Sequence, residues 1–204
     1  MTETGQQRRF DGKVTLVTGG SSGIGRAIAR LLGARGSRIV PPWSRAADRG
    51  PELASQAAEE ITVAGAEVEL VEADVTETGA ITHMLGAAGR RFGAVDHVIN
   101  CAAIIMTKPV IEVTEADYDR MFGVNARGAS FVLREAARRV REGGRIIACS
   151  MLLDFWRERG PSMSPFNRLG EPLDVAAAVC LLLQPEAHWL TGQTNFAGGG
   201  AYMG

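Results

Sequence analysis

A glycine-rich segment near the start of the chain carries the clearest chemical signal. Residues 18–25 read TGGSSGIG, after an apolar run and before an alanine-rich amphipathic stretch. Glycines at positions 19, 23 and 25 suit a sharp turn, a close approach of ligand to backbone, and tight packing of a helix on a strand. A helix that begins near Gly23 directs free N–H groups and its positive dipole end toward an anion. The segment predicts a dinucleotide phosphate site, although other tight strand-to-helix turns also use glycines.

The residues after the second expected strand bear on which dinucleotide is bound. An acid usually stands there to hold the ribose hydroxyls of NAD, and residues 41–45 contain none. Arg45 follows Trp43 and Ser44 instead, and a guanidinium suits a 2′-phosphate. The sequence therefore favours NADP over NAD, and a solvated surface arginine is the alternative interpretation.

Asp74 and Val75 follow the third expected strand. The Asp74 carboxylate can accept a hydrogen bond from the adenine amine. A helix-capping role for Asp74 is the alternative, because aspartate is also a preferred capping residue.

Composition narrows the class of protein. The chain has 204 residues, a net charge of −1 and scattered arginines, so we expect one domain over residues 1–204 and no nucleic-acid partner. The polar start and the short longest apolar run, 175–183, predict a cytoplasmic protein that does not enter a membrane. Three histidines and three cysteines have no metal-ligand spacing, so no metal is expected, and the cysteines are interpreted as reduced core residues.

Short apolar strands alternate with helical stretches along the whole chain. This alternation is typical of an α/β fold with a doubly wound, Rossmann-type parallel sheet. Strands are expected near residues 13–18, 37–41, 67–72, 94–101, 144–149 and 193–197, and helices near 23–35, 50–64, 77–91, 114–141 and 171–184. We predict six strands in the order 3-2-1-4-5-6.

Several of these segments together resemble the short-chain dehydrogenase/reductase family over most of the chain. TGGSSGIG is similar to the family's cofactor loop, and residues 100–103, Asn-Cys-Ala-Ala, resemble its Asn-Ala-Gly turn. Asn125, in VNARG, matches the Asn that supports a proton relay, and Ser150, which closes GGRIIACS, matches the Ser that binds the substrate carbonyl. Residues 167–172, 191–193 and 198–200 are similar to the family's C-terminal signature, in which Thr191 and Gly192 would stabilise the sheet end.

The resemblance implies an NAD(P)-dependent oxidoreductase that acts on a small alcohol or carbonyl compound and assembles as a homo-oligomer. It assigns catalytic roles to Ser150 and Asn125. The cofactor-binding residues that it implies are Thr18, Gly19, Ser21, Ser22, Gly23, Ile24, Gly25, Arg45, Asp74, Val75, Asn100 and Ala102.

The chain departs from the family pattern at its catalytic pair, Tyr-x-x-x-Lys. Its tyrosines are Tyr118 and Tyr202 and its lysines are Lys13 and Lys108, so no such pair exists. Tyr118 is interpreted as a packing residue of the long helix. One helix and one strand, a unit of roughly 30 residues or more, are missing after Ser150. We therefore predict impaired catalysis, and the alternative is a non-catalytic NADP-binding protein or a truncated remnant.

A hydrolase is the candidate from another enzyme class. Residues 19–23 also fit Gly-x-Ser-x-Gly with Ser21 in the centre, and Asp174 and His188 follow in triad order. Only one short strand precedes Ser21, whereas a nucleophile turn needs earlier strands to supply an oxyanion hole. The hydrolase interpretation is therefore disfavoured.

Overall fold

A four-stranded parallel sheet forms the centre of the protein in the order β2-β1-β5-β6. The computed structural model describes residues 9–47, 49–150 and 164–199. The four strands are β1 (Val14–Thr18), β2 (Arg38–Val40), β5 (Val95–Asn100) and β6 (Val140–Ala148). Every residue of β1 and β5 is buried, as expected for a parallel sheet that is covered on both faces.

The third expected strand lies beside the second, as predicted. Val68 forms a parallel bridge with Ile39 of β2, and β4 (Val71–Glu72) then pairs with β3 (Pro42–Trp43). The order 3-2-1-4-5 is thus confirmed for the first five predicted strands.

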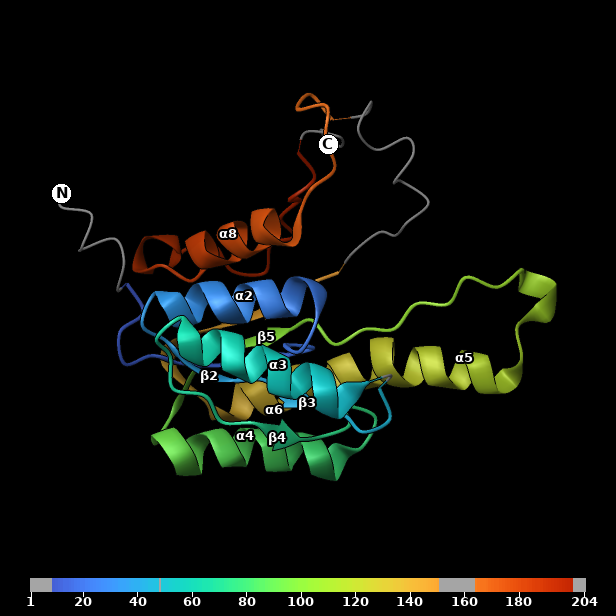
Figure 1. Ribbon diagram of the computed structural model, residues 1–204, viewed down its shortest axis with the longest axis horizontal. Coiled ribbons are helices and arrows are strands. Elements are labelled where there is room, and N and C mark those ends of the chain that lie inside the picture. The colour runs from blue at the N-terminus through green and yellow to red at the C-terminus, as the bar shows by residue number, and fades with distance from the viewer. Residues whose placement is uncertain (1–8, 48, 151–163, 200–204) are drawn as a thin grey trace.

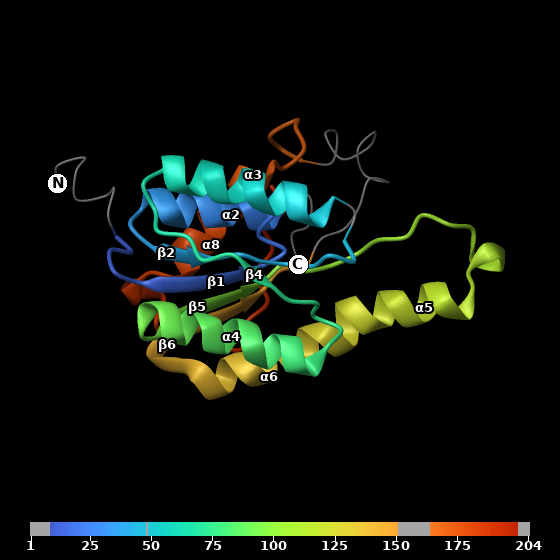
Figure 2. The same cartoon turned by 60° about the horizontal axis from the view of Figure 1, so that its bottom comes forward.

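Helices cover both faces of the sheet (Figures 1 and 2). Figure 2 shows α2 (Gly23–Ala34), α3 (Gly50–Val63) and α8 (Pro172–Leu182) above it. On the opposite face lie α4 (Thr78–Phe92) and α6 (Ala129–Arg139). The arrangement confirms an α/β, Rossmann-type fold, and short 3-10 turns η1 (Val110–Glu112) and η4 (Pro185–Ala187) lie in the connecting segments.

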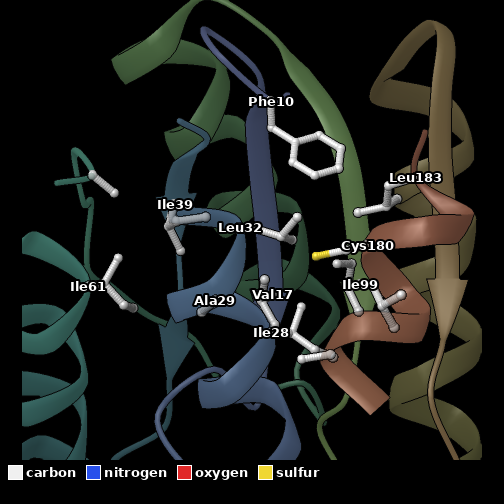
Figure 3. Close-up of a cluster of buried hydrophobic side chains, with 13 residues drawn as sticks. Phe10, Val17, Ile28, Ala29, Leu32, Ile39, Ile61, Ile99, Cys180 and Leu183 are labelled. Atoms are coloured by element: carbon white, nitrogen blue, oxygen red, sulfur yellow. The ribbon is translucent and has the colours of Figure 1, made fainter. Parts of the chain in front are cut away.

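Each face of the sheet has its own hydrophobic core, because successive strand residues point to opposite sides. Val17 and Ile99 join Ile28 and Leu32 of α2 and Cys180 of α8 in one cluster (Figure 3). The neighbouring strand residues Leu16 and Val98 belong to the other cluster, with α4 and α6. The two cores hold β1 and β5 rigidly, and these are the strands whose ends carry the predicted site.

The long helix predicted over 114–141 is confirmed over residues 115–139, with a π-helical segment in its middle. Its parts are α5 (Glu115–Phe122), a π-helical segment η2 (Gly123–Gly128) and α6, which follow one another without a break. Thr114 does cap α5, as the sequence indicates, through a capping box with Asp117. Gly143 and Gly144 do not end the helix but lie inside β6, where a register shift separates the Val95 pairing from the His97 pairing. A φ of +77° at Gly143 accommodates this irregularity.

Side chains of this long helix differ in their exposure. Tyr118 is half exposed and packs on Phe122 of the same helix, with ring centroids 4.2 Å apart. Phe122 is half exposed as well, whereas Val132 is fully buried between α6 and the sheet.

The sixth strand predicted near 193–197 is wrong as well. In the described parts of the chain this segment is irregular, and residues 188–199 are exposed. Thr191 and Gly192 accordingly do not stabilise a sheet end. The segment QTNFA has too few apolar residues to bury one face, and a strand is stable only where such a face packs.

A buried histidine makes the stability of this fold sensitive to acid. His97 lies on β5, is 4% exposed, and pairs through Nδ1 with the Thr15 hydroxyl at 3.2 Å. Burial lowers the pKa of His97 to about 4, and Lys13, Arg145 and Arg141 act in the same direction against the opposing charge of Asp96. The folded protein therefore keeps this ring neutral where an unfolded chain protonates it.

We predict that acidification from pH 7.5 to 4.5 destabilises the wild type by about 2 to 3 kcal/mol more than His97→Gln. Between the unfolded pKa of about 6.5 and the folded value of about 4, protons bind only to the unfolded chain, so stability present above pH 6.5 is lost as the pH falls. Urea unfolding at both pH values measures the difference. His83→Gln, at an exposed position of α4, should retain the wild-type dependence. Equal losses in wild type and His97→Gln would contradict the assignment.

Candidate cofactor and active site

The turn between β1 and α2 is tight because of its glycines. Gly19 has φ +67°, and a Cβ there would lie 2.9 Å from the carbonyl carbon and oxygen of Cys101. A Cβ on Gly25 would lie 2.2 Å from the Gly19 carbonyl oxygen. The start of α2 therefore packs directly on the turn, and the turn packs on the segment after β5. Larger residues at 19 and 25 would force these backbones apart.

Gly23 differs from its neighbours because its outer side is open. Its φ is +52°, and an added Cβ would meet no atom within 4 Å. Ser22, the N-cap of α2, makes no side-chain capping hydrogen bond, and the helix ladder begins with the Arg26 N–H donating to the Ser22 carbonyl at 3.0 Å. The N–H groups at the start of α2 are thus available to an anion, and the residues present fit a phosphate.

Ser21 and Ile24, the remaining residues of this segment, are partly buried. Ile24 packs against the cluster of α2 and α8.

The hydroxyl of Thr18 joins the ends of β1 and β5. It donates to Asn100 Oδ1 at 2.7 Å and accepts from the N–H groups of Cys101 at 3.2 Å and Ala102 at 3.1 Å. Thr18 and Asn100 are 1% and 5% exposed. Both were predicted as cofactor contacts, but the structure shows their side chains bonded to each other. Their role in the described geometry is to hold the turn at residues 100–103 against the glycine loop.

Asp74 lies at the same carboxyl edge of the sheet. Its carboxylate accepts from the Thr76 N–H at 2.8 Å, the Thr76 hydroxyl at 2.7 Å and the Ser44 hydroxyl at 3.0 Å. Burial opposes its ionisation, but these hydrogen bonds outweigh burial, so the pKa of Asp74 is lowered and the group is a carboxylate at neutral pH. The helix-capping alternative is wrong, since Glu77 is the N-cap of α4 and no side chain caps it. Val75 is half-buried next to Asp74.

Arg45 is an exposed arginine that already has a partner. Its guanidinium donates to both carboxylate oxygens of Glu72, at 3.0 and 2.8 Å, and lies 5.6 Å from the Trp43 ring centroid. The sequence interpretation missed Glu72. The only signal for it was that the second and third expected strands end side by side, which brings an acid from one strand to the arginine of the other.

Asn125 and Ser150 come from different elements. Asn125 lies in η2, and its side-chain amide donates to the Ile104 carbonyl at 2.8 Å while its oxygen accepts from the Ile104 N–H at 2.9 Å. Ser150 follows β6, and the register of Thr18 with Asn100 and of Asn100 with Ala148 places it at the edge of the sheet that carries the glycine loop. Among the described residues, no hydrogen bond joins Asn125 to Ser150. Asn125 instead positions the segment after the 100–103 turn.

Among the described residues, no tyrosine or lysine lies next to Ser150, where the family has its catalytic Tyr-x-x-x-Lys pair. Tyr118 stacks on Phe122 of α5, which projects from the body of the protein in Figure 1. Lys108 pairs with Asp117 at 2.7 Å, and Lys13 pairs with Asp96 at 3.2 Å at the opposite edge of the sheet. Tyr202 lies outside the described residues.

The hydrolase arrangement is not formed in the described part of the chain. Asp174 holds Arg168 through two contacts of 2.6 and 2.7 Å, and His188 Nδ1 contacts the Pro185 carbonyl at 3.1 Å. No hydrogen bond joins either residue to Ser21 or to the other. Residues 9–47, 49–150 and 164–199 also contain no cluster of three potential metal ligands. None of their helices combines the length and apolarity needed to cross a bilayer.

Known proteins resemble this chain in sequence and in fold. Versicolorin reductase stcU of Emericella nidulans is 32% identical over 260 residues, which cover 95% of this chain and 97% of that protein. The short-chain dehydrogenase/reductase dmxR18 of Cryptosporiopsis sp. is 38% identical over 142 residues, or 70% of this chain and 52% of that protein. A short-chain dehydrogenase from Burkholderia cenocepacia, solved in complex with NADP, superimposes with a TM-score of 0.84 at 25% identity, over 95% of this chain and 99% of that one.

This chain is shorter than the relatives that it matches. The alignment with the Emericella protein spans 260 residues against a chain of 204, so at least 56 of its positions have no counterpart here. A family model described as short chain dehydrogenase matches residues 13–154 and stops just beyond Ser150. Because that match covers more than half of the sequence and includes the glycine loop, Asn125 and Ser150, the chain belongs to the short-chain dehydrogenase family of oxidoreductases.

Proposed function

We propose that this protein binds NADP(H) at the carboxyl edge of its sheet and acts weakly on a small alcohol or carbonyl compound. The observation that carries the proposal is the uncapped, open start of α2 at Gly23, next to the turn that Thr18 holds in place. Asp74 and Arg45 lie at the same edge, where the adenosine part of a dinucleotide would lie. The NADP complex of the Burkholderia relative supports the choice of cofactor.

Each part of the chain would have a defined task toward this cofactor. The N–H groups at the start of α2 would hold the pyrophosphate, Asp74 would accept from the adenine amine, and Arg45 would meet the 2′-phosphate. The nicotinamide, when bound, supplies or accepts a hydride. Ser150 would orient the substrate carbonyl through its hydroxyl, and Asn125 would keep the segment at Ile104 in place.

The weak step is proton transfer. A serine hydroxyl is a poor acid at neutral pH, and this chain has no Tyr-x-x-x-Lys pair to deliver the proton. A positioned general acid contributes about 10²- to 10⁴-fold, or roughly 3 to 5 kcal/mol of activation free energy. The same absence favours a second candidate, a protein that binds NADP(H) without catalysis.

Gly23→Asp should weaken NADPH binding by about tenfold or more relative to Gly23→Asn, because a carboxylate at the start of α2 repels the pyrophosphate. The two side chains have nearly the same shape and both tolerate the positive φ of this position, so the comparison isolates charge. Titration of NADPH followed by energy transfer from tryptophan measures the affinity. Equal NADPH affinities in the two variants would show that the pyrophosphate does not bind at this loop.

Turnover of the wild type with a panel of aldehydes and ketones should be about 10²- to 10⁴-fold slower than that of a family member that has the Tyr-Lys pair. Oxidation of NADPH, followed by absorbance, measures the rate at saturating cofactor. Binding without any turnover would favour the non-catalytic candidate. A rate equal to that of the complete relative would mean that another group donates the proton and would contradict the predicted impairment.

Glu72→Gln should tighten NADPH binding by about two- to fivefold at low salt and leave NADH binding unchanged. The neutral amide releases the Arg45 guanidinium from an exposed ion pair that competes with the 2′-phosphate. The same substitution in an Arg45→Gln background should have no effect, which gives a double-mutant cycle. If Glu72→Gln tightened the binding of both nucleotides, or of neither, Arg45 would not be the residue that binds the 2′-phosphate.

A further inference from the structure

Two cysteines lie next to each other at the carboxyl edge of the sheet. Cys101 follows β5 and Cys149 follows β6, directly after the paired residues Asn100 and Ala148. The N–H of Cys149 donates to the Asn100 carbonyl at 2.9 Å, so the ladder extends to this point. Both cysteines are half-buried and pack against the core of α2 and α8. They are therefore lateral neighbours on one face of the sheet.

This placement suits a disulfide. Neighbouring strands lie about 4.8 Å apart, and disulfides form across Cα separations of about 4.4 to 6.8 Å. Both side chains pack against the same hydrophobic core, so they lie on the same side of the sheet.

The pair is chemically asymmetric. Interaction with Cys101 lowers the pKa of Cys149, while interaction with Cys149 and burial raise the pKa of Cys101. A lowered pKa favours the thiolate, so Cys149 is the better nucleophile of the two. Cys180, in α8, is fully buried, and burial raises the pKa of its thiol.

We propose that Cys101 and Cys149 are a reversible redox pair, closed to a disulfide by hydroperoxides, that controls the geometry of the cofactor turn. In the first step, the Cys149 thiolate attacks a peroxide oxygen, the O–O bond breaks, and the leaving oxygen takes a proton. The sulfenic acid on Cys149 is then attacked by the Cys101 sulfur, the S–O bond breaks, and the hydroxyl leaves with the Cys101 proton as water. Two thiols are oxidised by two electrons in all, hydrogen peroxide is reduced to water, and an external thiol reverses the change.

The link to the cofactor turn runs through the backbone of Cys101. Its N–H contacts both the carbonyl and the hydroxyl oxygen of Thr18, and its carbonyl group lies 2.9 Å from where a Gly19 Cβ would stand. Because the Cys101 backbone is bonded to Thr18 and lies close to Gly19, a shift of Cys101 toward Cys149 would move the glycine loop. This part of the inference rests on the proposed function, since the loop is the proposed phosphate site.

The experiment treats the full-length, reduced protein with a small excess of hydrogen peroxide and then counts thiols in denaturant. One of the three cysteines should remain titratable, and peptide mass analysis should find a Cys101–Cys149 link. NADPH affinity, measured on the same sample, should fall by about tenfold, the effect of losing roughly one hydrogen bond to the cofactor. Dithiothreitol should restore both the thiols and the affinity.

Two variants sharpen the result. Cys180→Ala should lose both remaining thiols on oxidation and show the same fall in NADPH affinity, whereas Cys149→Ala should keep its two thiols titratable. Three thiols surviving in oxidised wild type, or a link that includes Cys180, would overturn the pair. A Cys101–Cys149 disulfide with unchanged NADPH affinity would overturn its control of the turn. Thiol counting does not depend on NADPH, so a reduced protein that fails to bind NADPH refutes the proposed function separately.

Discussion

The buried hydroxyl of Thr18 is the constraint on which the proposed site depends. A threonine hydroxyl has one donor and two acceptor positions, and here it donates to Asn100 and accepts from two successive N–H groups after β5. Buried polar groups of this kind are costly to leave unpaired, so the four groups hold one geometry. Because β1 and β5 are buried on both faces, the glycine loop and the turn at residues 100–103 are fixed relative to each other.

This constraint separates residues that build the site from residues that face a ligand. Thr18 and Asn100 match the motif of a cofactor site, yet their side chains are used within the protein. The open groups are the N–H donors at the start of α2 and the outer side of Gly23. On the adenosine side, Asp74 is kept ionised by Thr76 and Ser44, whereas Arg45 is shared with Glu72. The proposed cofactor site thus combines a fixed glycine loop for the phosphates with the exposed ion pair of Arg45 and Glu72.

The chemical half of the site is less complete. Ser150 stands at the proper edge of the sheet, and Asn125 supports the segment at Ile104 from a π-helical turn. The relatives have an internal stretch that this chain does not match, and the family match ends at residue 154. The sheet of the described residues accordingly ends at β6, with Ile146 partly exposed at its edge. The carboxyl ends of β5 and β6 bring Cys101 and Cys149 together, where the proposed redox chemistry would reach the cofactor turn.

The sequence by itself determined the α/β class, the order of the first five strands, the glycine loop and the absence of a Tyr-Lys pair, because these depend on local periodicity and on residue identity. Only the tertiary structure decided that Thr18 binds Asn100, that Glu72 holds Arg45 and that Cys101 meets Cys149. Each of these pairs joins residues from strands far apart in sequence, and strand register is set by packing rather than by local pattern. The helix predicted over 114–141 formed with a slightly earlier end, whereas the strand predicted near 193–197 did not form. The helix ends at Arg139 because Val140 pairs with Val95, and the segment at 193–197 is exposed and has no face to pack.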